Sequence, residues 1–300
     1  MFWSFLKRRH YLGVDLDTTA IRTAVYRGRE LLTATVPAPP GGLNDPQALV
    51  AALAEAASRT GWHGRQAVTA ITGERVVVRY LRLPQMAPAE LKAGMAYELE
   101  NYLPTGARDM VVDWTILDDR SGRNNNQMPV LLAAAPREQV TQLYNIFQGA
   151  GLDLVAIDLV PLALCRALAA TISGAVTLLD IGDRWSHLVL TRSGQPLFSR
   201  VIAMGAGELA RPGIAGTSRL SELTQEVRRS LEFYRSQSGG EFNPERLVLT
   251  GEGVGVEGLL DFCQEELGVP VIPGRPGLAG GDAEPALAVA VGLALREIKP

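Results

Sequence analysis

Two short polar turns carry the residues of this chain that are best suited to chemistry. Each turn follows an apolar strand that contains an aspartate, and the two aspartates, Asp15 and Asp180, lie 165 positions apart. Backbone N–H groups of such turns point outward and bind anions. If the two turns face each other across a cleft, we expect them to cradle a polyphosphate. The turn residues are Asp17, Thr18, Thr19, Gly182 and Asp183.

The same cleft has groups for a metal ion and for a nucleoside. Asp15 and Asp180 are expected to hold Mg²⁺ through water, because this ion keeps several of its own waters. Arg22 can reach a phosphate oxygen, and Gly251 and Gly253 follow a strand and can let the backbone approach a nucleoside. The alternative is that the two aspartates only cap their turns. Because the arrangement occurs twice and a glycine turn accompanies it, we favour the cleft.

Other catalytic patterns are missing from the sequence. It has no P-loop and no nucleophile elbow, and His10, His63 and His187 are not spaced with carboxylates as metal ligands or as a triad. Cys165 and Cys263 lie far apart, which favours buried thiols in a reducing compartment. With 29 Lys and Arg against 32 Asp and Glu, the charge of −3 gives no reason to expect a nucleic-acid partner.

A unit of three strands joined by two tight turns occurs twice, over residues 11–36 and 176–202. Such a repeat indicates a duplication. Elsewhere strands alternate with helices, and this alternation predicts right-handed crossovers and a mostly parallel sheet in each of two related α/β lobes. The last helix, expected over 286–297, is rich in small residues and is predicted to pack tightly. Further helices are expected over 46–59, 136–147, 161–171, 220–234 and 259–267, and further strands over 67–72, 76–83, 111–117, 128–134, 152–158, 246–250 and 269–272.

The first nine residues combine aromatic and basic side chains. Phe2, Trp3 and Phe5 precede Lys7, Arg8 and Arg9, an order opposite to that of a secretory signal. No stretch reaches the roughly 18 apolar residues that a membrane helix needs. Two interpretations stay open, a frayed terminus, which we slightly favour, and a weak, reversible contact with an anionic membrane surface.

Three of these motifs resemble those of the actin-like ATPase superfamily, to which Hsp70 and the sugar kinases belong. Residues 14–19 (VDLDTT) are similar to its first phosphate motif, 179–182 (LDIG) to its second, and 249–253 (LTGEG) to its adenosine motif. The resemblance implies a ribonuclease H-like fold with duplicated lobes, and ATP and Mg²⁺ as cofactors. It also adds Gly205 and Gly207 to the expected nucleotide-binding residues.

Several short segments occur along the chain in a characteristic order: 97–104 (YELENYLP) with Asp113, 130–138 (VLLAAAPRE), 150–152 (AGL), 229–234 (RSLEFY) and 292–295 (GLAL). With these segments the chain resembles, over nearly its whole length, the PilM family of type IV pilus assembly proteins. The resemblance implies a cytoplasmic scaffold at the inner membrane that binds the short cytoplasmic N-terminal peptide of a PilN-like membrane protein. It also implies contact with pilus platform and motor proteins.

The resemblance also divides the chain, with a subdomain inserted as in the cell-division protein FtsA. The expected parts are an N-terminal segment, 1–9; a first lobe, 10–84 and 152–173 with the C-terminal helix 286–298; the insert, 85–151; and a second lobe, 174–285. The peptide would lie between the insert and the first lobe. The expected contact residues are Leu81, Leu83, Glu98, Tyr102 and Leu103. The alternative is that Leu99, Tyr102 and Leu103 only pack the insert onto its own sheet.

Several departures from the family affect the nucleotide site. PilM-like sequences usually have glycine where Asp17 stands, and a side chain there blocks close backbone approach. Its charge would repel a phosphate by roughly 4 kcal/mol at 4 Å with an effective dielectric near 20. Arg184 and Trp185 are bulky for a phosphate turn, and the stretch 207–220 is short, which implies a reduced second-lobe subdomain. We therefore predict weak or absent ATP binding and no useful hydrolysis.

Two other functions stay open at this point. One is an actin-fold ATPase or kinase with a working ATP site, against which stand Asp17 and the short second lobe. The other is an FtsA-like filament-forming protein, which would normally end in an amphipathic membrane helix.

Overall fold

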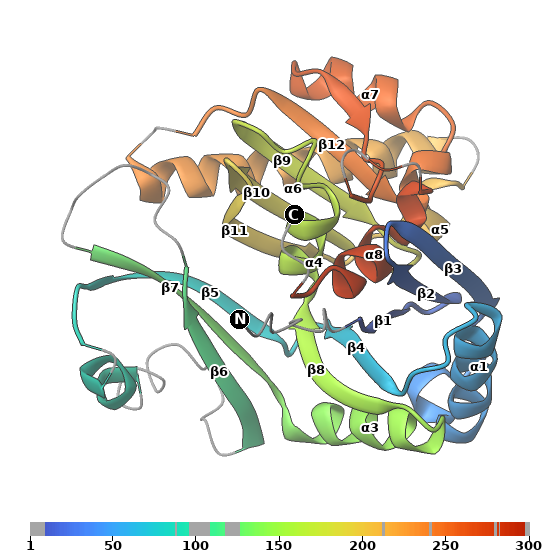
Figure 1. The fold of residues 1–300 in the computed structure, drawn as a ribbon. Coiled ribbons are helices and arrows are strands. Elements are labelled where there is room, and N and C mark those ends of the chain that lie inside the picture. The colour runs from blue at the N-terminus through green and yellow to red at the C-terminus, as the bar shows by residue number, and fades with distance from the viewer. Residues whose placement is uncertain are drawn as a thin grey trace.

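The computed structural model describes residues 10–87, 89–95, 109–117, 127–211, 214–239, 242–278, 281 and 283–297. Segment 1–9 and three of the expected peptide contacts, Glu98, Tyr102 and Leu103, lie outside these ranges. Within them the strands form three sheets (Figure 1). No helix in these ranges is long and apolar enough to cross a membrane.

Two of the sheets have the same topology. The first has the order β3 (Glu30–Pro37), β2 (Ala20–Arg27), β1 (Leu12–Leu16), β4 (Gln66–Ile71) and β8 (Asp153–Leu159). The second has the order β11 (Gln195–Ile202), β10 (Ser186–Arg192), β9 (Ala175–Ile181), β12 (Arg246–Gly251) and β13 (Val271–Pro273). This equivalence confirms the predicted duplication and the two α/β lobes.

The pairing within these sheets corrects one expectation. In each sheet the first three strands in spatial order pair antiparallel, and the remaining two pairings are parallel. The sheets are therefore mixed rather than mostly parallel. The reason is that the repeated hairpin unit is part of the same sheet as the strands that return through helices.

The third sheet has three antiparallel strands, β5 (Val77–Pro84), β7 (Gln127–Pro136) and β6 (Met110–Ile116), and extends to one side of the lobes (Figure 1). Because β5 pairs with β7, this sheet begins before residue 85, the boundary expected from the sequence. Helix α3 (Arg137–Gly149) packs against α1 (Pro46–Arg59) and β8. The insert sheet therefore extends from β5 to β7, and α3 packs on elements of the first lobe.

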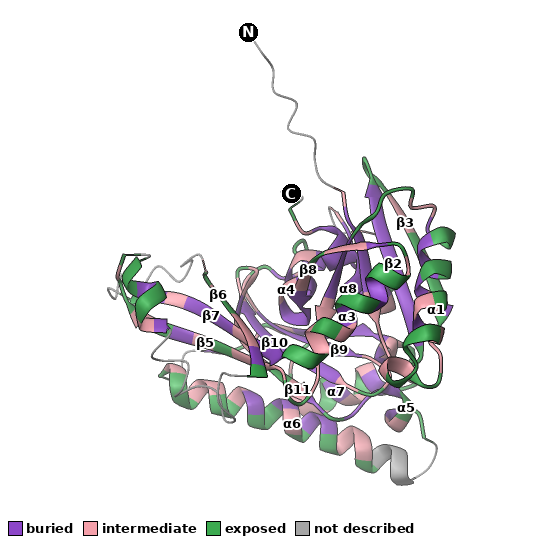
Figure 2. Ribbon diagram, turned by 90° about the horizontal axis from the view of Figure 1, so that it is seen from below, coloured by how far each residue is buried: buried purple, intermediate pink, exposed green. Residues whose placement is uncertain are grey.

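Helices cover the lobes and join them. Helix α1 begins as expected, with the Asp45 side chain accepting the N–H of Ala48 and Pro46 in the first turn. In the second lobe, α6 (Ile214–Ser238) has its buried residues, such as Leu223 and Val227, on one side, and its outer face is exposed (Figure 2). The second-lobe helices are α5 (Ala206–Leu209), α6 (Ile214–Ser238) and α7 (Leu259–Leu267).

Two short helices, α4 (Val160–Ala167) and α8 (Ala288–Ala294), cross at the centre of the molecule. All seven residues of α8 are buried. A Cβ at Gly292 would lie 1.9 Å from the carbonyl oxygen of Ala163, and one at Gly13 would lie 2.1 Å from that of Ala290. The backbones of α4, α8 and β1 are thus in direct contact, which confirms the predicted tight packing. Both helices are shorter than expected, and a 3₁₀ turn (Pro285–Leu287) precedes α8.

We predict that Gly292→Ala lowers the free energy of unfolding by about 1–3 kcal/mol, because the new methyl group overlaps the backbone of α4. Denaturant unfolding at neutral pH measures the change. Gly94→Ala is the matched control, since nothing lies within 4 Å of a Cβ at that helical position. The control should be neutral or slightly more stable. Equal stabilities of the two variants would contradict the close crossing of α4 and α8.

Candidate functional site

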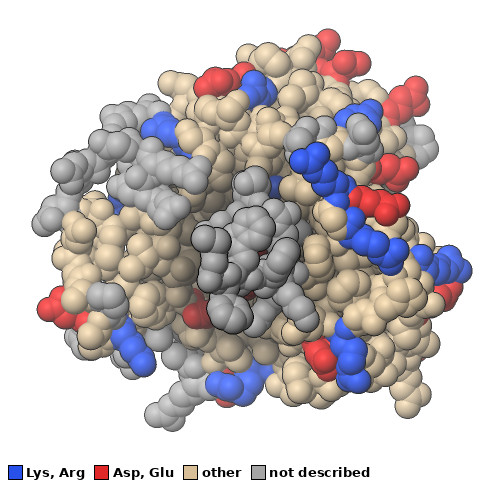
Figure 3. Space-filling view, viewed as in Figure 1, with Lys and Arg blue, Asp and Glu red and all other residues tan. Residues whose placement is uncertain are grey.

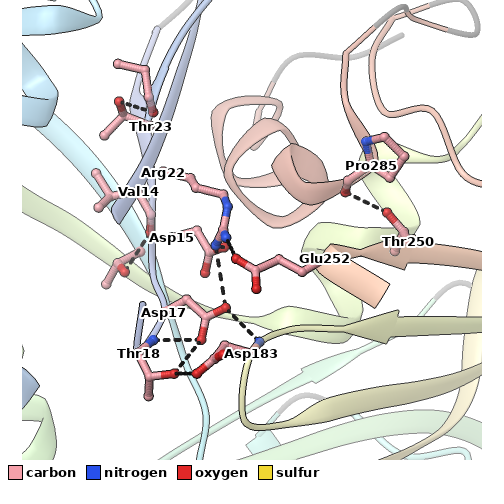
Figure 4. A network of polar contacts seen from close by, with 12 residues as sticks. Val14, Asp15, Asp17, Thr18, Arg22, Thr23, Asp183, Thr250, Glu252 and Pro285 are labelled. Carbon is pink, nitrogen blue, oxygen red and sulfur yellow. Dashed lines mark hydrogen bonds and ion pairs between the residues drawn. The ribbon is translucent and has the colours of Figure 1, made fainter. Parts of the chain in front are cut away.

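The two polar turns face each other across the junction of the lobes, as the repeat predicted. Asp17 follows β1, and Gly182 and Asp183 follow β9. The hydroxyl of Thr18 donates to Asp183 Oδ2 at 2.8 Å, and the backbone N–H of Asp183 donates to Asp17 Oδ2 at 3.3 Å (Figure 4). Thr19 is exposed, and its carbonyl accepts the N–H of Ala38 at 2.9 Å. The turns are therefore bonded to each other.

Arg22 lies at the centre of this junction. Its side chain is only 5% exposed and projects from β2. Nη1 lies 3.7 Å from Asp15 Oδ2 and 3.5 Å from Asp17 Oδ2, and Nη2 is ion-paired with Glu252 (Figure 4). Glu252 comes from the glycine turn after β12, so one guanidinium joins carboxylates of both lobes. The group expected to reach a phosphate is occupied by carboxylates of the chain itself.

Burial changes the acidity of the groups around Arg22. It raises the pKa of Asp180 to about 8, and the charge of Asp15 adds to the effect. Burial likewise raises the pKa of Asp15 to about 7, with the charge of Asp17 as the next cause. The pKa of His187 falls to about 4, because burial disfavours its charged form. At neutral pH the Asp180 carboxyl is therefore mainly protonated and the His187 ring is neutral.

The open space between the turns is small. The cavity there has a volume of about 50 Å³, whereas pockets for small molecules are typically about 300–1,000 Å³. Six of the expected nucleotide-binding residues line it: Asp15, Asp17, Arg22, Asp180, Gly182 and Gly251. Within the part of the chain that the structure describes, no group of three or more His, Cys, Asp or Glu residues is arranged to hold a metal ion.

The glycines near the cavity are in contact with neighbouring parts of the chain. Gly251 has φ +78°, and a Cβ there would lie 2.4 Å from the carbonyl oxygen of Ile181. Gly253 packs on the side chain of Ile181 in the same way. Gly205 and Gly207 both lie against Asp183 of the second turn. These positions accordingly bring the second turn, β12 and α5 close together.

Eight residues that were not among the expected site residues also line the cavity, and four of them have polar side-chain groups: Thr72, Trp185, His187 and Glu252. The Thr72 hydroxyl lies 3.3 Å from His187 Nε2 and so connects β4 to β10 across the lobes. The sequence repeat could have identified His187 as a cavity residue. Arg22 lies opposite Asp15 on neighbouring strands, and His187 lies opposite Asp180 in the equivalent pair.

A second hollow, the insert groove, lies between the inner face of the three-stranded sheet and the first lobe. Its volume is about 440 Å³. Apolar side chains form much of its wall, with Asp113 and Arg296 among the charged residues. Arg296 Nη1 is 2.8 Å from Asp158 Oδ2, whose side chain is 2% exposed. Representative wall residues are Ile71, Leu131, Ala133, Ile157 and Leu162.

Two expected peptide contacts lie away from this groove. Leu81 and Leu83 pack with Leu91 and Met95 of the helical segment 89–95. They alternate along β5 with Tyr80, which packs with the groove-wall residue Leu131. Because neighbouring residues of a strand point to opposite faces, the two leucines lie on the sheet face that is turned away from the groove. The contacts observed at these two positions are with other apolar residues of the insert.

The face seen in Figure 3 has acidic and basic side chains interspersed, without a broad patch of one sign. Such a distribution lacks the basic stripe typical of nucleic-acid binding.

Comparison with known proteins gives a consistent result. Residues 25–213 match the family described as type IV pilus assembly protein PilM. A solved PilM–PilN type IV pilus biogenesis complex contains a chain 29% identical to this one, with a TM-score of 0.85, covering 98% of this chain and 100% of that one.

More distant structures share the fold alone. The cytoplasmic domain of EpsL, an inner-membrane component of the type II secretion system of Vibrio cholerae, is 15% identical with a TM-score of 0.54, over 97% of this chain and 94% of that one. A protein of Bacteroides thetaiotaomicron with an actin-like ATPase fold is 13% identical with a TM-score of 0.52, over 98% and 99%. The fold of the present chain is thus the actin-like one.

The buried Asp180 predicts a pH dependence of stability. Its folded pKa of about 8 lies above the value of about 3.9 for an unfolded aspartate, so the folded state binds the extra proton. This contribution to stability is present at low pH and is lost as the pH rises toward about 8.

We therefore expect Asp180→Asn, which does not titrate, to gain stability relative to the native protein by more than about 1 kcal/mol between about pH 5.5 and about pH 8.5. Urea unfolding of both proteins across this range measures the difference. A difference that stays constant with pH would mean that Asp180 titrates normally.

Proposed function

This chain belongs to the PilM family of type IV pilus assembly proteins, and from that premise we propose that it is a cytoplasmic adaptor for a PilN-like inner-membrane protein. It binds the short N-terminal peptide of that protein and does so without nucleotide. The observation that carries the proposal is the similarity over the full length of both chains to a protein solved in a PilM–PilN complex.

The insert groove is the peptide site in this proposal. Its volume of about 440 Å³ is within the range of specific ligand pockets. The wall is mainly apolar around Leu131, Ala133 and Ile157, so it can bury apolar side chains of a peptide. Asp113 is exposed and Arg296 partly exposed, and together they offer one charge of each sign to the peptide backbone or to polar side chains.

The sheet edges next to the groove suit an extended peptide. β8 is the last strand of the first sheet, and β6 is the last strand of the insert sheet. Both strands contribute residues to the groove, including Ile157 from β8 and Thr115 from β6. An edge strand has free backbone N–H and C=O groups, with which a peptide in extended conformation can pair. The expected contacts Glu98, Tyr102 and Leu103 stay part of the proposal.

The closed cleft supports a nucleotide-independent adaptor. The cavity of about 50 Å³ is several times smaller than a typical ligand pocket. Arg22 and Asp17 are engaged with groups of the chain itself, and Ile181 lies against Gly251 and Gly253. These residues do not fit ATP and Mg²⁺ as they stand. We infer that the nucleotide site is degenerate and that the protein does not hydrolyse ATP.

The remaining parts of the proposal concern location and assembly. A protein that binds the cytoplasmic tail of a membrane protein is held at the inner membrane by its partner, next to the pilus platform and motor proteins. The aromatic and basic residues Phe2, Trp3, Phe5 and Lys7–Arg9 would add a weak contact with anionic lipid. A filament-forming protein is the competing proposal, and sedimentation of the purified protein tests for polymers.

Blocking the groove is the direct test of the peptide site. We expect Ala133→Arg to weaken binding of a synthetic PilN-like N-terminal peptide by about tenfold or more, because the new side chain fills the groove. Isothermal titration calorimetry measures the affinity. Ala54→Arg, on the exposed face of α1, is the matched control and should bind as the native protein does. Equal binding by all three proteins would place the peptide elsewhere.

The same calorimeter tests the nucleotide site. We expect titration with Mg-ATP to give no saturable heat up to about 1 mM, and no rise in melting temperature. The peptide titration on the same preparation shows that the protein is active. A saturable ATP isotherm would reject the degenerate site and leave the peptide assignment standing.

A further inference from the structure

We propose that the carboxylate of Asp17 takes the place of a bound anion between the two turns and, by accepting bonds from both, stabilises the closed arrangement of the lobes. The two turns form a binding site for a small anion with two acceptor oxygens, and the chain fills this site with one of its own side chains. This inference does not depend on the peptide partner, and its test uses neither peptide nor nucleotide.

Donors of both lobes converge on this carboxylate (Figure 4). On one oxygen, Oδ1, it accepts the backbone N–H of Thr18 at 2.7 Å. On the other, Oδ2, it accepts the backbone N–H of Asp183 at 3.3 Å and lies 3.5 Å from Arg22 Nη1. Two backbone N–H groups from turns, together with a cation, form an anion-binding concavity. Charge-assisted bonds of this type are stronger than neutral ones.

The neighbouring backbone leaves room for the carboxylate. Gly182 lies beside it, and a Cβ at that position would approach Asp17 Oδ2 to 3.0 Å. The Asp17 side chain is only 17% exposed, so solvent covers little of the carboxylate. The turn of Asp17 is itself closed, because the backbone N–H of Asp17 donates to the carbonyl of Ala20 at 3.0 Å. The carboxylate is thus held at a defined place rather than extended into solvent.

Removing the side chain would leave the N–H of Asp183 without its acceptor and would take from Arg22 Nη1 one of its two neighbouring carboxylates, the other being that of Asp15. The N–H of Asp183 and Nη1 of Arg22 would face an empty position of carboxylate size, bordered by Gly182. A free anion with at least two acceptor oxygens, such as formate or inorganic phosphate, can accept the same bonds. The Thr18–Asp183 and Arg22–Glu252 contacts still join the lobes in such a variant, so it keeps the means to fold.

The experiment is an anion rescue of Asp17→Gly. Hydrogen exchange of the Asp183 amide, followed by NMR, reports on the bond that crosses the lobes. Without added anion we expect this amide to exchange at least about tenfold faster than in the native protein. Sodium formate should restore the protection with a saturable dose response, and inorganic phosphate should do the same. Sodium chloride at equal ionic strength should not.

Two further variants test whether the effect is specific to the charge at position 17. Asp153→Gly removes an exposed aspartate that pairs with Arg65 on the first lobe, and it should show native exchange of the Asp183 amide at every anion concentration. Asp17→Asn keeps an acceptor oxygen and loses the charge. Its exchange should lie between those of the native protein and Asp17→Gly, and it provides the reading if the glycine variant does not fold.

Three outcomes would overturn the inference. One is native protection of the Asp183 amide in Asp17→Gly without any anion. Another is rescue by sodium chloride as complete as that by formate, which would mean general screening of the acidic cleft. The third is native exchange in Asp17→Asn, which would mean that the charge of Asp17 has no part in closing the lobes. Failure of the peptide titration would leave all three readouts unaffected.

Discussion

A single buried guanidinium, that of Arg22, balances the acidic groups that both lobes bring to their junction. Asp15 and Asp17 come from the first lobe and Glu252 from the second, and all three pair with Arg22. Removing one partner of a buried ion pair typically costs about 3–5 kcal/mol, because the other charge is left uncompensated. Asp180 is not one of the ion-pair partners of Arg22, and burial raises the pKa of its carboxyl to about 8, so that it keeps its proton at neutral pH. The closed arrangement of the lobes thus depends on one positive charge placed by β2.

The junction of the lobes is closed, whereas the insert groove is open. Between the lobes, polar groups bond to one another and leave a cavity of about 50 Å³. Beside the insert, the sheet stands away from β8 and leaves a hollow of about 440 Å³, bordered by β8 and β6, the outer strands of their sheets among the described residues. The two places are near each other, since Thr72 of the junction directly follows β4 and Gln139 of α3 donates to its carbonyl. The actin-like fold therefore combines a closed junction with an open hollow, which is the peptide site in our proposal.

Local patterns in the sequence predicted much of this structure. The repeated hairpins, the facing turns, the buried small-residue helix and the helix over 46–59 all follow from short-range spacing and residue type. The sequence did not predict that β5 belongs to the third sheet. Strand β5 pairs with β7 about 50 positions later in the chain, and pairing at that distance leaves no local signal. The size of the cleft also escaped prediction. It depends on contacts at the ångström scale, such as that of Ile181 with Gly251. A glycine-rich turn can be approached either by a ligand or by another part of the chain, and the sequence does not say which.

The crossing of α4 and α8 has a mechanical consequence. Where helices meet through interleaved side chains, they can slide by small repacking steps, which is the usual shear motion. Here Gly292 brings backbone against backbone, so no layer of side chains is available to repack. The contact can rotate but cannot glide. Because α8 packs on β1 and β2 of the first sheet and α4 also contacts β10 and β11 of the second, any relative movement of these two sheets should be a swing about the crossing, with displacements that grow with distance from it.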